Sequence, residues 1–140
     1  MTTPSSKPAE TILVVDDDPE VLSLAVDILG MAGYNILSTT DPRHALRLAR
    51  TDAELLHLLL TDVVMPLMNG MQLATEVLAL RPEVKILLMS AYRTKETDDY
   101  RMRLGLRGLF LDKPFTVDGL TAAVRSLLSD RAPSPWRRVK

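Results

Sequence analysis

Five short apolar runs alternate with stretches that have the spacing of amphipathic helices, and this alternation constrains the fold more than any other feature. The runs cover residues 11–15, 34–39, 56–61, 84–89 and 108–111. Strands that alternate with helices form a mainly parallel sheet with helices packed on both faces. Right-handed crossovers then bring the carboxyl ends of all five strands to one edge. The sequence therefore predicts an α/β fold with about five helices in a three-layer sandwich.

Helix starts and stops lie between these runs. Asp18-Pro19 and Asp41-Pro42 each place a capping residue before a proline at the first helical position. Asn69-Gly70 closes a loop before the third helix, and apolar spacing indicates a final helix from 117 to 128. The stretch 94–104 is polar with a weak apolar face, which predicts only a marginal helix.

Charged side chains follow three of the predicted strands. Asp16 and Asp17 follow the first, Asp62 the third and Lys113 the fifth. Ligands of open α/β sheets bind at the carboxyl edge, where these groups should meet. Three carboxylates so close together would repel one another, and a hard divalent cation would relieve the repulsion. Mg²⁺ suits the site because it takes few protein carboxylates and leaves room for a phosphoryl oxygen.

Ser90 completes the expected edge, and both Ser90 and Lys113 also have a simpler interpretation. Ser90 ends the fourth predicted strand, where its hydroxyl could bond a phosphoryl oxygen or simply close a turn. Lys113 lies between a strand and Pro114, which makes it a candidate phosphate clamp or a solvated surface charge. We interpret Asp18 as a helix cap rather than a ligand.

Composition narrows the class of protein. The chain has 140 residues, a formal net charge of −1 and no cysteine, which excludes thiol chemistry and gives no broad basic surface for nucleic acid. It has no apolar run of membrane-spanning length, and we expect a cytoplasmic protein. The expected organisation is a disordered leader (1–10), one domain (11–129) and a flexible basic tail (130–140) that includes Trp136.

Four motifs in order resemble the receiver domain of bacterial two-component response regulators. They are Val14-Val15-Asp16-Asp17, Thr61-Asp62-Val63-Val64-Met65-Pro66-x-Met68-Asn69-Gly70, Met89-Ser90-Ala91 and Lys113-Pro114-Phe115. The resemblance covers about residues 10–129. It implies the flavodoxin-like strand order 2-1-3-4-5 of the chemotaxis members. It also implies a protein that accepts a phosphoryl group from a sensor histidine kinase or a phosphotransfer protein.

The resemblance implies a role for each matching position. Asp62 would be the phosphoacceptor, and Asp17 would bind Mg²⁺ directly while Asp16 acts mainly through water. The backbone carbonyl of Val64 would complete the protein's share of the coordination. Lys113, joined to Pro114 by a cis peptide bond, would hold the phosphoryl group. Ser90 and Phe110 would be the switch pair, with Ser90 moving toward the phosphate and Phe110 turning inward.

Several positions depart from the family pattern. Val64 and Tyr92 lie two residues after Asp62 and Ser90, where relatives often carry polar residues that position water. We therefore hypothesise a long-lived phosphorylated state. Before Phe110 the chain has Arg107-Gly108-Leu109 in place of the acidic pair of many DNA-binding relatives, which leaves dimerisation through that face in doubt. Phe110 has no hydroxyl, so its switching would depend on packing.

These residues allow three functions. The leading interpretation is a single-domain receiver that acts on an unidentified protein partner, without direct DNA binding or membrane association. A haloacid-dehalogenase-like phosphohydrolase would use Asp16 and Asp18, but Pro19 fits that pattern poorly and Asp62 would have no task. A pseudo-receiver that binds partners without phosphorylation is the third. His44 and His57 have no paired base or ligand spacing and are interpreted as structural.

Overall fold

The computed structural model describes residues 9–51 and 55–129, and its centre is one parallel sheet. The strand order is β2-β1-β3-β4-β5, which confirms the flavodoxin-like prediction. Each crossover between neighbouring strands contains a helix, as parallel pairing requires. The strands are β1 (Thr11–Val15), β2 (Asn35–Thr39), β3 (Leu58–Asp62), β4 (Lys85–Ser90) and β5 (Gly108–Asp112).

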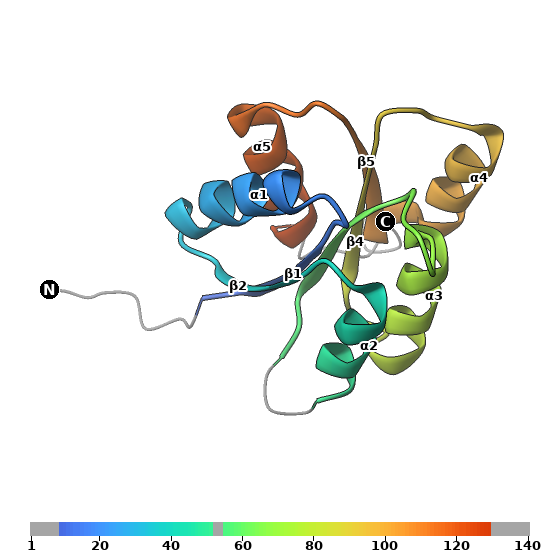
Figure 1. Cartoon of the computed structure of the whole chain (residues 1–140), viewed down its shortest axis with the longest axis horizontal. Coiled ribbons are helices and arrows are strands. Elements are labelled where there is room, and N and C mark those ends of the chain that lie inside the picture. The colour runs from blue at the N-terminus through green and yellow to red at the C-terminus, as the bar shows by residue number, and fades with distance from the viewer. Residues whose placement is uncertain (1–8, 52–54, 130–140) are drawn as a thin grey trace, which may run out of the picture.

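Five helices cover the sheet on both faces. Figure 1 shows α1 and α5 on one face and α2, α3 and α4 on the other. A single 3-10 turn, Gly105–Arg107, leads from α4 into β5. The helices are α1 (Pro19–Met31), α2 (Pro42–Arg50), α3 (Gly70–Leu80), α4 (Lys95–Leu104) and α5 (Val117–Leu128).

Two apolar clusters hold the three layers together, because successive strand residues point to opposite faces. Ile12 and Val14 of β1 pack toward Leu29 of α1 and Leu120 of α5. Leu13 and Val15 belong to the other cluster, with residues of α2, α3 and α4. Burial of each such leucine or isoleucine side chain contributes about 1.5–3 kcal/mol to the stability of the fold. The central strands are thus fixed in register, and their carboxyl ends are held at one edge.

The structure corrects one helix prediction and several strand ends. The stretch predicted as marginal is the regular helix α4, because Thr94 and Thr97 cap its first turn reciprocally. A capping box satisfies two amide groups that would otherwise lack partners. β3 and β4 each end one residue later than predicted, so Asp62 and Ser90 are themselves strand residues, with Asp62 opposite Met89.

The structure also bears on the predicted helix cap, the two histidines and the terminal segments. Asp18 caps α1, since its Oδ1 accepts from the Glu20 amide at 2.9 Å. His57 Nδ1 accepts from the Thr11 amide at 3.0 Å, and His44 Nδ1 lies 3.0 Å from Thr39 Oγ1, so both histidines have hydrogen-bonded structural places. Residues 1–8 of the predicted leader and all of the predicted tail lie outside the described residues. Within the described ranges, no helix combines the length and apolarity needed to cross a bilayer.

Candidate phosphoacceptor site

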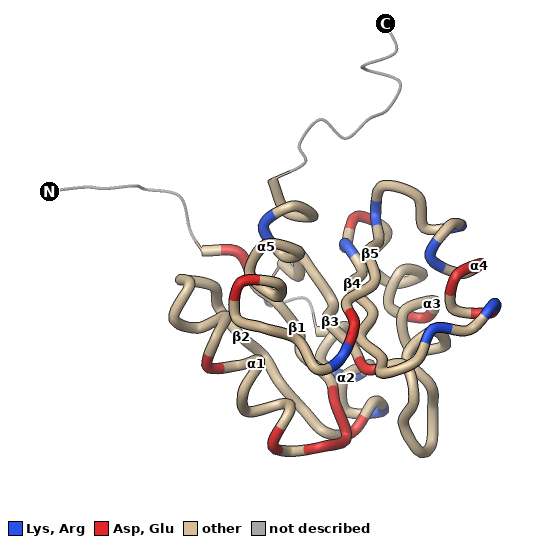
Figure 2. Tube along the Cα trace, turned by 90° about the horizontal axis from the view of Figure 1, so that it is seen from above, with Lys and Arg blue, Asp and Glu red and all other residues tan. Residues whose placement is uncertain are grey.

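Three acidic residues that the sequence predicts as metal ligands meet at the carboxyl edge of the sheet. β1 and β3 are neighbours with Val15 opposite Thr61, so the residues that follow them are brought together. Carboxylate oxygens of Asp16, Asp17 and Asp62 all lie within 4.8 Å of one another. In Figure 2 the acidic segment that leads from β1 into α1 is drawn in red. This arrangement is the juxtaposition that the sequence predicts.

Lys113 lies between two of these carboxylates. Its Nζ donates to Asp16 Oδ2 at 2.8 Å and lies 3.4 Å from Asp62 Oδ1. Its side chain is 18% exposed and that of Asp16 is fully buried, so solvent screens this pair far less than a surface pair. The Lys113 amide donates to the Ser90 carbonyl, and the Lys113–Pro114 bond is cis. Lys113 is therefore held by both its backbone and its ammonium group.

Burial and interactions between neighbouring charges shift the pKa values of Asp62 and Lys113. Burial, and next the neighbouring Asp16 carboxylate, raise the pKa of Asp62 from 3.8 to about 6, although Lys113 opposes the shift. For Lys113, burial lowers the pKa, but the hydrogen bond and charge of Asp16 and then Asp62 outweigh it, so its pKa is raised. The three carboxylates exceed the one ammonium by two charges. Such an excess is the electrostatic condition that a divalent cation would satisfy.

The donor set fits a hard cation. Asp16 Oδ1 accepts from the Asp18 amide at 2.9 Å and its Oδ2 accepts from Lys113, so both oxygens already have partners. Asp17 is exposed and Asp62 is 7% exposed, which leaves their oxygens more accessible to a ligand. Oxygen donors of this kind, with space for water, suit Mg²⁺.

Ser90 and Phe110 are positioned beyond this cluster. Ser90 is 3% exposed, and its Oγ donates to the Tyr92 carbonyl at 2.8 Å while accepting the Tyr92 amide at 3.1 Å. The hydroxyl thus closes a turn in this structure. Phe110 lies in β5 opposite Leu88, partly buried against the cluster of α2, α3 and α4. Ser90 and Phe110 therefore occupy β4 and β5, the strands beyond Asp62.

Val64 and Tyr92 are both exposed side chains near the carboxyl edge. Val64 is 69% and Tyr92 75% exposed, on the loops that follow β3 and β4. Their apolar and bulky surfaces thus face solvent rather than the core.

Sequence reasoning missed the structural roles of two residues of the site. Gly70 packs on the backbone of β3, and a side chain there would collide with the Asp62 carbonyl oxygen. Thr61 Oγ1 donates to that same oxygen at 2.9 Å. Asn69-Gly70 was interpreted as a loop signal and as the end of the second motif, and neither interpretation gave Gly70 a packing role. Thr61 opens the second motif, but a threonine within a strand is ordinary and gave no reason to expect its hydrogen bond to this carbonyl.

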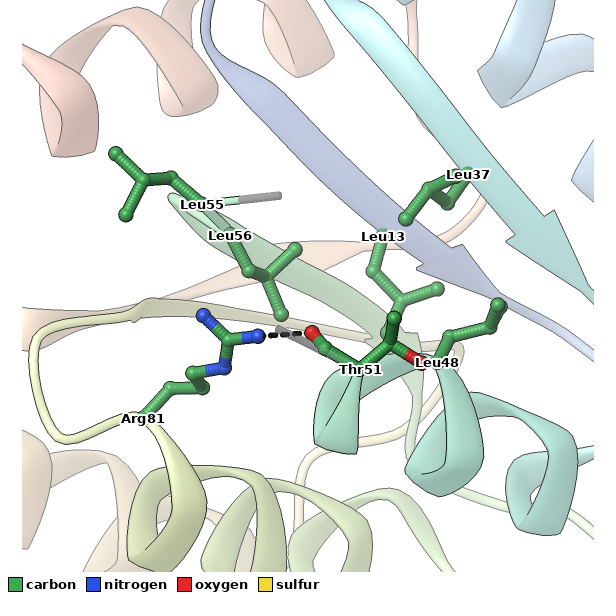
Figure 3. A pocket seen from close by; sticks show the side chains of 7 residues that line it. All are labelled: Leu13, Leu37, Leu48, Thr51, Leu55, Leu56 and Arg81. Carbon is green, nitrogen blue, oxygen red and sulfur yellow. Dashed lines mark hydrogen bonds between the residues drawn. The ribbon is translucent and has the colours of Figure 1, made fainter. Parts of the chain in front are cut away.

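A separate hollow of about 180 Å³ lies between the end of α2 and the sheet. In Figure 3 the Arg81 guanidinium reaches across its rim to the Thr51 carbonyl. Arg81 Nε also donates to the Ala49 carbonyl at 3.0 Å, so this cation ties α3 to the end of α2. The lining residues are Leu13, Leu37, Leu48, Thr51, Leu55, Leu56 and Arg81. We assign this hollow no part in the chemistry of Asp62.

Known proteins are similar to this chain in sequence and in fold. Residues 12–125 match the family model "Response regulator receiver domain". The chain is 32% identical over 127 residues to the DNA-binding transcriptional regulator NtrC of Azospirillum brasilense, covering 89% of this chain and 25% of that protein. It is 34% identical over 118 residues to the transcriptional regulatory protein ZraR of Escherichia coli K12, covering 84% and 26%.

Solved structures give the same result. A CheY-like receiver domain protein from Methanospirillum hungatei JF-1 superimposes with a TM-score of 0.80 at 25% identity, covering 89% of this chain and 97% of that one. The receiver domain of the hybrid histidine kinase CckA gives a TM-score of 0.71 at 29% identity, covering 84% and 98%.

The fold and the sequence matches agree on one class of protein, the receiver domain. The chain belongs to the response regulator receiver domain family of two-component systems. It spans about a quarter of the length of the curated relatives NtrC and ZraR.

Proposed function

We propose that this receiver accepts a phosphoryl group on Asp62 from a sensor histidine kinase or a phosphotransfer protein. The observation that carries the proposal is Lys113 Nζ, which lies between the Asp16 and Asp62 carboxylates at an edge shared with Asp17. A nucleophilic oxygen, a fixed cation and a set of metal-ligating oxygens are the groups that phosphoryl transfer requires. The proposed receiver domain extends from 11 to 129.

In the proposed reaction, an oxygen of ionised Asp62 forms a bond to phosphorus. The bond from phosphorus to the donor's histidine nitrogen breaks, and its electron pair returns to that imidazole. A pKa of about 6 leaves most Asp62 ionised at neutral pH, while its burial keeps the carboxylate less hydrated than a surface group. The ammonium of Lys113 would exchange part of its contact with Asp62 for the incoming phosphoryl oxygens.

Asp17, Asp62 and the backbone carbonyl of Val64 would hold Mg²⁺, with Asp16 acting mainly through water. The two hydrogen bonds that already occupy Asp16 favour this indirect role. When bound, Mg²⁺ neutralises charge on the phosphoryl oxygens. The backbone at the ends of β1 and β3 would hold these carboxylates in position.

The phosphorylated state would act through contacts that only it can make. A phosphoryl group adds about −1.5 to −2 charge beside Asp62. Ser90 Oγ would leave Tyr92 to donate to it, and Phe110 would turn inward in response. Differential contacts of this kind bias a two-state surface that a protein partner can read. The protein would then catalyse only its own phosphorylation and dephosphorylation. That it is a single-domain regulator, without direct DNA binding, stays a prediction.

Intact mass after incubation with Mg²⁺ and acetyl phosphate tests the proposal. Wild type should gain one phosphoryl group, and Asp62→Asn should gain none. An adduct that survives in Asp62→Asn but is lost in Asp16→Asn would support the hydrolase instead. Absence of an adduct in correctly folded wild type would support a pseudo-receiver and contradict the proposal.

A further inference from the structure

A cation lies on the ring that we propose as the switch. The guanidinium carbon of Arg93 is 4.6 Å from the centre of the Phe110 ring. Arg93 Nε also lies 3.6 Å from Asp98 Oδ1, in the first turn of α4. Arg93 therefore connects the loop after β4, the start of α4 and the aromatic side chain of β5. Electrostatic attraction between a guanidinium and a ring face stabilises such a stack.

Both partners of this contact belong to elements that the proposed switch would move. Arg93 lies three residues after Ser90, in the loop whose turn is closed by the hydrogen bonds between Ser90 Oγ and Tyr92. Phe110 is paired through β5 with Leu88 of β4. If Ser90 moved toward Asp62, it would break the Tyr92 turn and pull the loop that carries Arg93. If Phe110 turned inward, its ring would leave the guanidinium.

We propose that Arg93 is a latch that holds Phe110 and the loop after β4 in the arrangement seen here, and so opposes the phosphorylation-dependent switch. This inference rests on the proposed function, because it concerns the equilibrium that phosphorylation of Asp62 would shift. Arg93 is a positioning residue in this scheme and does not touch the reacting atoms. Its contact with Asp98 orients the guanidinium over the ring.

The size of the effect follows from the exposure of the contact. The Arg93 side chain is 50% exposed, so the stack belongs to the weaker class of cation–ring contacts. Loss of such a contact should shift a two-state equilibrium about two- to fivefold. A ligand that binds only the switched state would gain the same factor in apparent affinity while that state remains the minor one.

Beryllium fluoride with Mg²⁺, a mimic of the phosphoryl group on a carboxylate, is the probe. We would titrate wild type, Arg93→Ala, Arg93→Lys, Phe110→Leu and Arg93→Ala/Phe110→Leu, and follow binding by backbone amide chemical shifts. Arg93→Ala should lower the apparent Kd about two- to fivefold. Arg93→Lys should lie between Arg93→Ala and wild type. The effect of Arg93→Ala should disappear in the Phe110→Leu background, because leucine presents no ring face.

Arg103→Ala is the matched control. Arg103 stacks on Tyr100 at 5.3 Å within α4, so this variant removes a similar contact without touching Phe110. It should leave the Kd unchanged. An unchanged Kd in folded Arg93→Ala would overturn the proposal that Arg93 opposes the switch. A raised Kd would also overturn it and would assign Arg93 to phosphoryl binding. Failure of wild type to bind the probe, or binding that persists in Asp62→Asn, would contradict the proposed function itself.

Discussion

The hypothesis that Val64 prolongs the phosphorylated state can be tested with a single substitution. An amide side chain at this exposed position could orient a water molecule toward the phosphoryl group, as general-base positioning requires. We expect Val64→Asn to dephosphorylate faster than wild type, as followed by loss of the phosphoryl mass. Val117→Asn is the control, since Val117 is also exposed but begins α5. Equal dephosphorylation rates in wild type and Val64→Asn would contradict the hypothesis that Val64 prolongs the phosphorylated state.

The raised pKa of Asp62 predicts a stability cost in the absence of metal. An acid whose pKa is higher in the folded state favours folding while it is protonated. That contribution is complete below pH ~4 and is lost as pH rises through about 6, so the ionised group opposes folding at neutral pH. In buffer with chelator at pH 7, Asp62→Asn should be more stable than wild type by on the order of 1–2 kcal/mol.

Chemical denaturation from pH 4 to pH 7 measures this difference. The gap between Asp62→Asn and wild type should widen as pH rises, because only wild type carries the ionising carboxyl. A pH-independent gap, or a less stable Asp62→Asn, would show that burial and Asp16 do not penalise the ionised form of Asp62.

The loop between β3 and α3 and the first residue of α3 pack against the backbone of Asp62, the proposed phosphoacceptor. Gly70 begins α3, and its amide donates to the Val63 carbonyl at 2.8 Å. Because a Cβ at 70 would collide with the Asp62 carbonyl, Gly70→Ala should push this loop away from β3. We expect a loss of about 1–3 kcal/mol in stability and slower phosphorylation by acetyl phosphate.

Gly30→Ala is the corresponding control within a helix. A Cβ at Gly30 would meet nothing within 4 Å, and alanine favours the helical backbone by about 0.5–1 kcal/mol. This variant should be neutral or slightly more stable, with unchanged phosphorylation. If Gly70→Ala behaved in the same way, Gly70 would not be required for the geometry of β3.

The elements show where sequence reasoning succeeds and where it does not. Apolar runs and Asp-Pro starts sufficed for β1, α1 and α2, because local signals and burial agree there. For α4 the apolar face is weak, and its first turn depends on Thr94 and Thr97 capping each other, a side-chain exchange that the pattern alone does not reveal. Tyr100 Oη also lies 2.9 Å from Thr75 Oγ1 of α3, so tertiary contacts support this helix.

Sequence reasoning likewise predicted only part of the candidate site. That Asp16, Asp17, Asp62 and Lys113 would meet followed from strand order and the shared carboxyl edge. Which carboxylate Lys113 bonds most closely did not follow, because that depends on side-chain reach across β1 and β3. The stacking of Arg93 on Phe110 was likewise absent from the sequence reading, since residues in a loop and in a strand carry no fixed spacing.

For the whole molecule, a bound cation should raise the free energy of unfolding. A ligand that binds only the folded state stabilises it by RT ln(1 + [L]/Kd). Thermal unfolding at pH 7 should therefore shift upward with added Mg²⁺ in wild type, because the ion relieves repulsion among three carboxylates. The shift should be much smaller in Asp17→Asn. A full shift in that variant would contradict direct coordination by Asp17.

The most direct test of the central claim is the position of the phosphoryl group in the intact chain. After acetyl phosphate and Mg²⁺ treatment, borohydride reduction converts an aspartyl phosphate to homoserine, which peptide mass mapping can locate. Our account predicts homoserine at position 62 in wild type, with none elsewhere. Homoserine at position 16, or phosphoryl incorporation that leaves Asp62 unmodified, would contradict it.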